Sequence, residues 1–311
     1  MRILEYEVPR KYDGAVVSDF LQCEHGFSRR IITAIKRIDN GILRSGEHIR
    51  MIDTVYHGDT ITVKLPERGT LEPNGELDVA IIYHDEDIII FDKPVNMPVH
   101  PSFNHYNDTL GNFYSHICEG RTFRPINRLD RNTSGLCIVA KNSLAAVNLQ
   151  RSSNARDGND IPGTTIDKTY YAICHGRIDE DSGTINAPIA REGDSIIKRI
   201  VSDSGQNALT EFTMLGRAED ATLLKIKLIT GRTHQIRVHF SHIGNPLFGD
   251  DLYGGSNELI SEHALHCGEL SFIHPISRES IQVQSRIREN MLELLDRLDI
   301  QPPALKSGRI E

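Results

Sequence analysis

Cysteine is scarce in this chain of 311 residues, and no two cysteines stand at the C-x-x-C spacing of zinc sites and redox pairs. The five occur at Cys23, Cys118, Cys137, Cys174 and Cys267. An odd and scattered set argues against a disulfide framework and against a structural zinc site. A reducing compartment is the default for such a protein, so we expect a cytoplasmic localisation.

Long apolar runs are also absent, because no stretch approaches the roughly 20 apolar residues that cross a bilayer. The opening sequence MRILEYEVPR carries two glutamates and has no apolar core like that of a signal peptide. Hydrophobic residues make up 39% and charged residues 25% of the chain, as in folded globular proteins. We expect a globular protein of two domains with no membrane partner.

The net charge of −8 argues, as an average, against a nucleic acid partner. Local charge decides polyanion binding, however, and one segment is strongly basic. Between residues 27 and 50 the net charge is +4, with two acidic residues against six basic ones: Arg29, Arg30, Lys36, Arg37, Arg44 and Arg50. The average therefore conceals a candidate basic face near the N-terminus.

The N-terminal part has the pattern of a small α+β unit. Ser28 suits a helix N-cap, and it precedes an apolar stripe at helical spacing formed by Ile31, Ile32, Ile35 and Ile38. Four basic residues fall off that stripe and are expected to face solvent: Arg29, Arg30, Lys36 and Arg37. Two helices and a strand meander fit between residues 13 and 65, with short strands at 42–43, 48–51 and 60–65.

From residue 66 to 74 the sequence PERGTLEPN lacks periodicity, and beyond it short β-type segments dominate. Strands are predicted at 79–83, 88–91, 137–140, 170–174, 210–214 and 222–229. Helices are fewer, and they are predicted at 143–150, 233–242 and 286–298. Because strands and helices do not alternate regularly, an α+β fold with a mixed sheet fits better than a doubly wound one. The polar stretch 151–166 is interpreted as a surface excursion.

The predicted division of the chain follows from these patterns. The first domain covers residues 1–65, and a linker covers 66–77. The second, larger domain covers residues 78–311.

The stretch RLDRNTSGL, residues 128–136, places a carboxylate between two arginines just before an apolar strand. Guanidinium groups near Asp130 would lower its pKa and keep it ionised even when partly buried. Such a group suits a nucleophile or a fixed anion better than a general acid. The alternative is a structural ion pair in a loop.

The stretch TGRTHQIRVH, residues 230–239, follows a predicted strand and opens a helix with a glycine turn. Thr233 is predicted to cap this helix, and Arg237 one turn later can reach a carboxylate from elsewhere in the fold. The alternative is a capped surface helix. Two histidine pairs with a spacing of three invite a zinc site, but further clustered ligands are lacking. We therefore predict hydrogen-bonded structural histidines at His239, His242, His263 and His266.

The stretch KTYYAICHG, residues 168–176, is predicted to be a strand in which Tyr170 and Tyr171 face opposite sides. One tyrosine should belong to the core, and the other can offer a stacking surface to a nucleobase. Two tyrosines packed in the core are the alternative.

Taken together, the three stretches resemble the signature motifs of the RluA family of RNA pseudouridine synthases, in the family's order and at compatible spacing. The segments 85–94 and 263–275 resemble the start and the closing strand of the family's domain, so the resemblance covers roughly residues 78–290. The basic N-terminal segment resembles, more loosely, an S4-type RNA-binding domain. The implied fold is α+β, with a mixed, mostly antiparallel sheet and flanking helices, plus a small S4-like domain.

The resemblance implies roles for individual residues. Asp130 matches the family's catalytic aspartate, Tyr170 the tyrosine that packs on the target base, and Arg237 the arginine that pairs with the aspartate. Substrate binding is expected from Arg128, Arg131, Arg232, His234, Gln235 and Ile236. RNA binding by the S4-like segment is expected from Arg29, Arg30, Lys36 and Arg37. Asn127 stands where a histidine is common, and Cys267 replaces the usual alanine, which we expect to be a packing change.

The implied activity is the isomerisation of uridine in RNA to pseudouridine, in which the N1–C1′ bond breaks, the uracil turns and C5 joins C1′. The target nucleotide must first be flipped out of its stack. No metal or organic cofactor is implied, in line with the absence of GxGxxG and GK[ST] motifs. Tyr170 can also help to remove the C5 proton, and acylal, oxocarbenium and glycal paths all stay open.

Large-subunit ribosomal RNA is the first expected target and transfer RNA the second, for a monomer with no obligate protein partner. Two other classes of protein compete. A nucleoside or glycoside hydrolase would attack the same carbon, with Asp250 or Asp251 as a second carboxylate. A non-catalytic RNA-binding or ribosome-assembly factor would use the S4-like segment, although the intact set of Asp130, Tyr170 and Arg237 argues against it.

Overall fold

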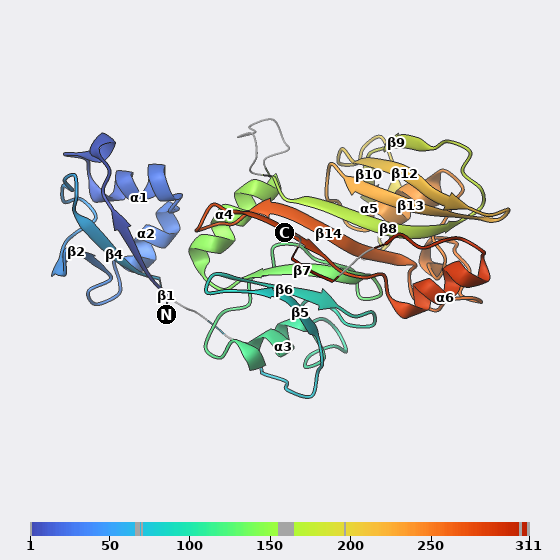
Figure 1. Ribbon diagram of the computed structural model, residues 1–311, viewed down its shortest axis with the longest axis horizontal. Coiled ribbons are helices and arrows are strands. Elements are labelled where there is room, and N and C mark those ends of the chain that lie inside the picture. The colour runs from blue at the N-terminus through green and yellow to red at the C-terminus, as the bar shows by residue number, and fades with distance from the viewer. Residues whose placement is uncertain are drawn as a thin grey trace.

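The computed structural model of the chain describes residues 2–65, 69, 71–154, 165–195, 197–304 and 307–309. The strands in these residues form three sheets, of four, ten and two strands. The four-stranded sheet and its helices lie at one end of the molecule, and the ten-stranded sheet belongs to the larger remainder (Figure 1). No helix in this part of the chain is both long and apolar enough to span a membrane.

The N-terminal unit is an antiparallel sheet packed against two helices (Figure 1). Its strands follow the order β1 (Arg2–Glu7), β4 (Thr60–Leu65), β2 (Ile42–Arg44) and β3 (Glu47–His48). The helices are α1 (Val17–His25) and α2 (Arg29–Ile35), preceded by the short η1 (Arg10–Tyr12). One buried cluster joins helices and sheet, with members such as Phe20, Leu21, Ile35 and Val63.

Helix α2 begins where the sequence predicted. The Ser28 side chain accepts a hydrogen bond from the backbone N–H of Ile31 at 3.3 Å, which confirms the N-cap. The apolar stripe is buried at Ile31, Ile32 and Ile35. The side chains predicted to face solvent are exposed, namely Arg29, Arg30, Lys36 and Arg37.

The ten-stranded sheet is mixed but mostly antiparallel, as expected for the α+β fold. Along its main path the strands are β5 (Ala80–His84), β6 (Ile88–Lys93), β7 (Ser134–Ala140), β14 (Leu265–Ile273), β8 (Asp167–His175), β13 (Ala221–Leu228), β12 (Leu209–Arg217) and β9 (Ser182–Asn186). Strand β15 (Ser280–Gln284) pairs with β14 and with β16 (Gly308–Arg309). The pair formed by β7 and β14 is parallel.

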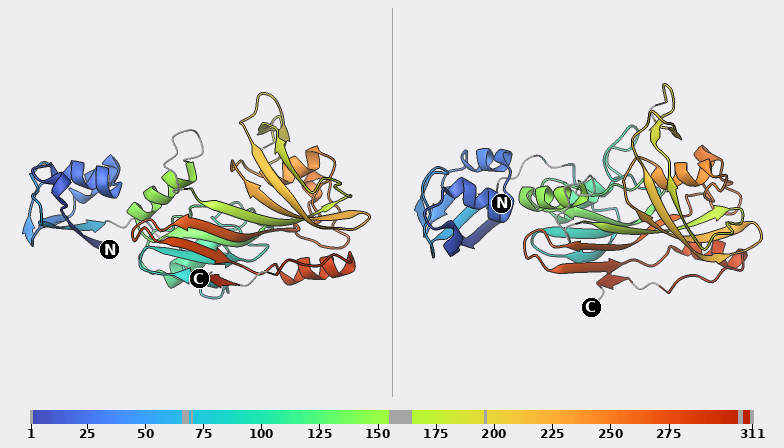
Figure 2. Two further views of the ribbon diagram at one scale, coloured as in Figure 1. Left: turned by 45° about the horizontal axis from the view of Figure 1, so that its top comes forward. Right: turned by 90° about the horizontal axis from the view of Figure 1, so that it is seen from above.

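Helices and a small hairpin flank this sheet. The helices are α3 (Leu110–Ile117), α4 (Ser143–Asn154), α5 (Gln235–His242), η3 (Asp251–Tyr253) and α6 (Glu289–Arg297). Strands β10 (Ile189–Arg191) and β11 (Arg199–Val201) pair with each other, beside α5 (Figure 2). Helix α4 extends into the stretch predicted as a surface excursion, whose residues 155–164 lie outside the described residues.

The parallel seam between β7 and β14 explains the glycine of the RLDRNTSGL stretch. Gly135 pairs with Cys267 across this seam. It has a φ of +109°, and a Cβ on it would lie 2.3 Å from the carbonyl oxygen of Cys267. Any side chain there would force the two strands apart, so glycine lets the segment that carries Asp130 join the middle of the sheet.

Strand β8 contributes side chains to two buried clusters, one on each face of the sheet. Tyr170 packs with Ile236 and Phe240 of α5, whereas Tyr171 packs with residues of α6. This confirms that the two adjacent tyrosines face opposite sides. Both belong to the core, with Tyr170 6% and Tyr171 2% exposed. Cys267 is fully buried in the Tyr170 cluster, which fits the expected packing change.

The N-terminal unit contacts the larger one through β1 and α4. Leu144 of α4 is buried in the N-terminal cluster. Nε of Arg2 lies 3.0 Å from Oδ1 of Asp87, and Arg151 donates to the carbonyl oxygen of Gly26 at 2.9 Å. In the predicted linker, the described residues 69 and 71–77 hold no helix or strand. The domain boundaries at 65 and 78 stay predictions.

Candidate functional site

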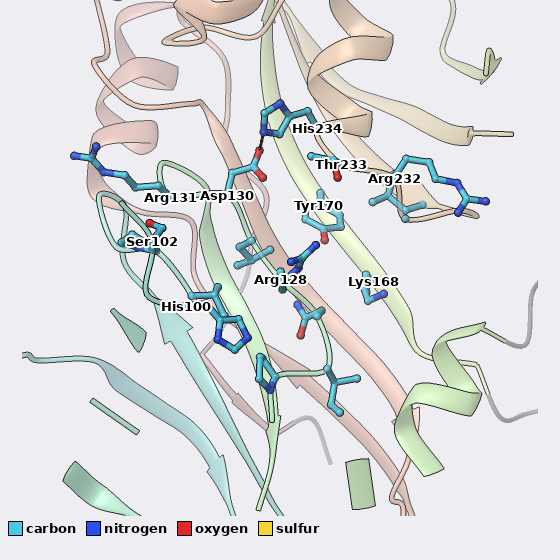
Figure 3. A pocket seen from close by; sticks show the side chains of 18 of the residues that line it. His100, Ser102, Arg128, Asp130, Arg131, Lys168, Tyr170, Arg232, Thr233 and His234 are labelled. Carbon is cyan, nitrogen blue, oxygen red and sulfur yellow. Dashed lines mark ion pairs between the residues drawn. The ribbon is translucent and has the colours of Figure 1, made fainter. Parts of the chain in front are cut away.

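A cleft of about 980 Å³ lies where the three sequence stretches meet (Figure 3). Its walls come from the segment after β6, the loop before β7, strand β8 and the turn between β13 and α5. Asp130 lines it from the β7 loop, Tyr170 from β8 and His234 from the turn before α5. The fold thus gathers polar side chains that lie far apart in the sequence.

Asp130 and Arg237 form an ion pair at this cleft. The Nη1 atom of Arg237 donates to Oδ2 of Asp130 at 2.8 Å. The Asp130 side chain keeps 29% exposure, whereas that of Arg237 is 4% exposed. Among the described residues, no side chain or backbone group donates a hydrogen bond to Oδ1 of Asp130. The arginine therefore holds one carboxylate oxygen from inside and leaves the group accessible from the cleft.

Asp250 binds the other side of the same guanidinium. Nε of Arg237 donates to Oδ2 of Asp250 at 2.7 Å, and Nη2 donates to Oδ1 at 2.8 Å. The Asp250 side chain is fully buried. This bidentate pair holds the arginine in one orientation, with Nη1 free to reach Asp130.

The sequence suggested Asp250 only as the second carboxylate of a hydrolase, and this interpretation is wrong. Both of its oxygens bind Arg237, so it is not available as an acid or base opposite Asp130. Asp251 is exposed and does not line the cleft or the neighbouring recess. Among the described residues that line these two cavities, Asp130 is the one acidic side chain.

Neighbouring groups set the charge of Asp130. Burial by itself raises the pKa of the carboxyl, but the positive charges of Arg237 and, when it is protonated, of His234 outweigh burial and hold the pKa below its ordinary value. Burial lowers the pKa of Arg237, yet the bonds to Asp250 and Asp130 raise it above its ordinary value. Both members of the pair are therefore charged at neutral pH.

A recess of about 70 Å³ adjoins the cleft beside Asp130. Its apolar walls are formed by Tyr170, Leu228, Ile236 and Leu265. Burial raises the pKa of Tyr170 well above its ordinary value, so the phenol stays protonated at neutral pH. The recess therefore combines aromatic and aliphatic surface with one ionised carboxylate.

The predicted substrate-binding arginines surround the cleft. Arg128 lies beside Tyr170, whereas Arg131 and Arg232 extend away on opposite sides (Figure 3). Arg128 and Arg131 are exposed. Arg232 donates through Nε to the carbonyl oxygen of Asn207 at 2.9 Å. Several lining residues were not predicted from the sequence, among them Phe103, which is 83% exposed.

The turn before α5 differs from prediction in two ways. Thr233 does not cap the helix, because His234 occupies the N-cap position with a φ of 58° and no side-chain capping bond. Gln235 lines the recess but is 2% exposed. Its amide forms hydrogen bonds within the protein, to Arg232, Thr230, Leu209 and Thr210. It therefore braces the turn that presents His234.

Asn127, which departs from the family pattern, has a structural contact of its own. Its Nδ2 donates to the carbonyl oxygen of Leu136 at 3.0 Å, and its Oδ1 accepts from the backbone N–H of Ile138 at 2.8 Å. The side chain thus clamps the loop before Asp130 to strand β7. An imidazole is not needed for this clamp.

Lys93 is a buried residue to which the sequence patterns assigned no role. Its Nζ donates to the carbonyl oxygens of Pro94, Met97 and Arg131 at 2.7, 2.8 and 3.1 Å. Burial lowers the pKa of Lys93 to about 7. The lysine ties the segment after β6 to the residue next to Asp130. Its signal in the sequence is a lone cation that ends an apolar strand.

Of the four histidines considered as zinc ligands, two are hydrogen-bonded within the protein, whereas His242 is exposed and Nδ1 of His263 is buried without a hydrogen-bond partner among the described residues. Both ring nitrogens of His239 form hydrogen bonds, as do those of His266, which confirms a structural role for these two. Elsewhere in the described chain, the side chains of Asp85, Asp87 and His274 lie close enough together to hold a metal ion. Its carboxylates already accept hydrogen bonds from Arg2, Tyr83 and Asn142.

Comparisons with known proteins identify relatives of this chain. A model of the family described as RNA pseudouridylate synthase matches residues 87–242. A Bacillus subtilis protein named uncharacterized RNA pseudouridine synthase YjbO is 36% identical over 278 residues, which cover 88% of this chain and 95% of the relative. The ribosomal large subunit pseudouridine synthase D of Xanthomonas campestris is 32% identical over 309 residues, with 93% and 89% covered.

Solved structures show the same fold. Human RNA pseudouridylate synthase domain containing 1 matches with a TM-score of 0.57 at 24% identity, over 75% of this chain and all of that one. Human RNA pseudouridylate synthase domain containing 4 matches with a TM-score of 0.58 at 22% identity, over 72% and 95%. Since the family model spans half of the sequence and relatives above 30% identity span nearly all of it, the chain belongs to the RNA pseudouridylate synthase family and is an RNA pseudouridine synthase.

Proposed function

We propose that this enzyme converts uridine in large-subunit ribosomal RNA to pseudouridine, with Asp130 as the reacting carboxylate. The observation that carries the proposal is an ionised aspartate, held by buried Arg237, at the mouth of a recess walled by Tyr170. The choice of RNA is supported by the relative named ribosomal large subunit pseudouridine synthase D. Transfer RNA is the second candidate.

A uridine stacked in a helix cannot reach this recess, so it must first be flipped out at a cost of a few kcal/mol. The flipped base would lie against Tyr170, Ile236 and Leu228, which line the recess. Tyr170 would act by stacking rather than as a base, because its pKa is raised and its phenol is protonated. Exposed Phe103 on the cleft wall would offer a second stacking surface.

The reaction conserves every atom of the substrate. The N1–C1′ bond breaks, the uracil turns within the recess and a bond forms between C5 and C1′; the proton lost from C5 is balanced by the proton that N1 gains, so the composition is unchanged. Asp130 suits attack at C1′, charge stabilisation there or proton removal at C2′, because it is ionised and its Oδ1 has no protein donor among the described residues. Arg237 would keep the carboxylate charged throughout.

We further propose that residues 2–65 form an RNA-binding domain. The exposed basic residues of α2 and the turn after it would contact phosphates, which adds affinity rather than sequence choice. Replacing Arg29, Arg30, Lys36 and Arg37 by glutamine should weaken binding to all RNA sequences alike. The slope of log affinity against log salt should become shallower by about one for each phosphate that the variant no longer neutralises.

Filter binding or fluorescence anisotropy at several salt concentrations measures this slope. The matched control replaces Lys225 and Lys227 by glutamine, since these lysines lie on β13 and pair with Glu269 and Asp167. An unchanged slope in the quadruple variant would show that the RNA surface lies elsewhere.

Pseudouridine mapping in total RNA tests the target directly. Carbodiimide modification and primer extension on cells with and without the gene should reveal one or a few stops in large-subunit ribosomal RNA that depend on the gene. The wild-type gene should restore them, and one encoding Asp130→Asn should not. Stops that disappear only from transfer RNA would select the second candidate, and the release of free uracil would indicate hydrolysis instead.

A further inference from the structure

We propose that His234 is a positioning residue that directs an Nε2–H donor at Asp130, and that the hydroxyl of Tyr253 sets this tautomer. The inference rests on the proposed function, because it assigns a second partner to the carboxylate that would act there. Nε2 of His234 lies 3.7 Å from Oδ2 of Asp130, within electrostatic contact and slightly beyond a hydrogen bond. Such contacts often tighten when a substrate binds.

The position of His234 is held by its side chain rather than by its backbone preference. The residue has φ 58° and ψ 19°, in the left-handed region that residues with a Cβ rarely adopt. Its Nδ1 lies 2.9 Å from the hydroxyl oxygen of Tyr253. The two rings also meet edge to face, with their centroids 5.7 Å apart. Tyr253 thus fixes the direction in which Nε2 points.

The hydroxyl of Tyr253 decides which ring nitrogen carries the proton. Its oxygen accepts a hydrogen bond from the backbone N–H of Arg199 at 2.9 Å, and the hydroxyl has one proton to donate. If that proton goes to Nδ1, His234 must carry its own proton on Nε2, toward Asp130. The other tautomer would set the Nε2 lone pair against the carboxylate and leave the tyrosine proton without this acceptor.

The surroundings of the His234 ring favour its neutral form, which can still donate a hydrogen bond through one N–H. Six ionisable groups interact with His234, namely Asp130, Arg199, Arg237, Asp250, Tyr253 and His263. Burial lowers the pKa of His234, so the ring is uncharged at neutral pH. The Arg237 guanidinium lies 4.9 Å from the centre of the Tyr253 ring. One tyrosine therefore orients both partners of the carboxylate.

Single-turnover kinetics of the full-length enzyme on an RNA transcript test the assignment. His234→Leu should slow the chemical step by about 10-fold or more, while the dissociation constant for RNA changes less than about threefold. His234→Gln, which keeps an N–H donor, should recover part of the rate, and Tyr253→Phe should slow the step severalfold. His242→Gln makes the same change at the exposed end of α5 and should match the wild type.

The pH profile separates a positioning role from a structural one. Loss of a donor to the charged carboxylate raises the pKa of Asp130, so the acidic limb of the rate should move to higher pH in His234→Leu. A smaller shift in the same direction is expected for Tyr253→Phe. A rate that falls equally at every pH, with the limb unmoved, would overturn the proposal.

Nitrogen-15 NMR of labelled histidines tests the tautomer without relying on activity. His234 of the wild type should carry its proton on Nε2, and Tyr253→Phe should weaken that preference. A proton on Nδ1 in the wild type would overturn the proposal. A wild-type enzyme that modifies no ribosomal or transfer RNA would instead contradict the proposed function, and the NMR result would still decide the tautomer.

Discussion

Replacement of Asp130 by asparagine is expected to abolish pseudouridine formation while RNA binding stays within about threefold of the wild type. The amide has nearly the same shape and can still accept a hydrogen bond from Nη1 of Arg237. It has no negative charge, however, so it cannot serve as nucleophile, anion or base at the ribose. The rate of the chemical step should fall by a factor on the order of 10³ or more.

Single-turnover measurement of pseudouridine in a transcript, together with a binding assay, checks this expectation. Asp251→Asn is the matched control, because it makes the same change one residue from buried Asp250, at an exposed carboxylate outside the cleft. Its rate should equal that of the wild type. Appreciable turnover by Asp130→Asn would refute the role of this carboxylate.

Replacement of Arg237 by methionine is expected to remove activity and to destabilise the fold by about 3–5 kcal/mol. The large effect on stability comes from Asp250, which would be left as a charge with no exposure and without its bidentate partner. The effect on activity comes from Asp130, whose pKa would rise once the guanidinium is gone. Urea denaturation and the same single-turnover assay measure the two effects.

A double variant separates these two consequences. Arg237→Met combined with Asp250→Leu removes both members of the buried pair, and it should recover much of the stability but none of the activity. A single variant as stable as the wild type would mean that the buried pair does not hold this part of the fold.

The environment of Asp130 also distinguishes isomerisation from hydrolysis at the same carbon. A glycosidase places two carboxyl groups on either side of the bond that it breaks. Here the second carboxylate, Asp250, lies behind the arginine with both oxygens engaged. The described lining of the cleft offers one anion and a recess that has apolar walls at Tyr170, Leu228 and Ile236, which suits a base that is detached, turned and rejoined.

Local patterns in the sequence were sufficient to predict several elements. The cap at Ser28, strand β4 and the opposite directions of Tyr170 and Tyr171 all depend on spacing within a few residues. Within a helix or a strand, the direction of each side chain follows from the local backbone geometry, so residue spacing over a few positions predicts it. The motifs that indicated the family are likewise continuous stretches.

Such local patterns could not predict the contacts between distant segments. The helix α3 was not predicted, and most of its residues, including polar Asn112 and Ser115, are buried in the fold. The cap at Thr233 was predicted wrongly, because the internal bonds of Gln235 and the contact of His234 with Tyr253 override the local preference.

Composition and local patterns predicted the α+β class, the three stretches that bear the chemistry and, as a hypothesis, the two-part organisation. The folded chain was needed to show that β14 lies between β7 and β8, that Asp250 holds Arg237 against Asp130, and that Tyr253 reaches His234. These contacts join distant segments, and the pairing of Asp130 with Arg237 alone spans 107 positions. Its geometry depends on the order of strands in the sheet, and no periodicity in the chain encodes that order.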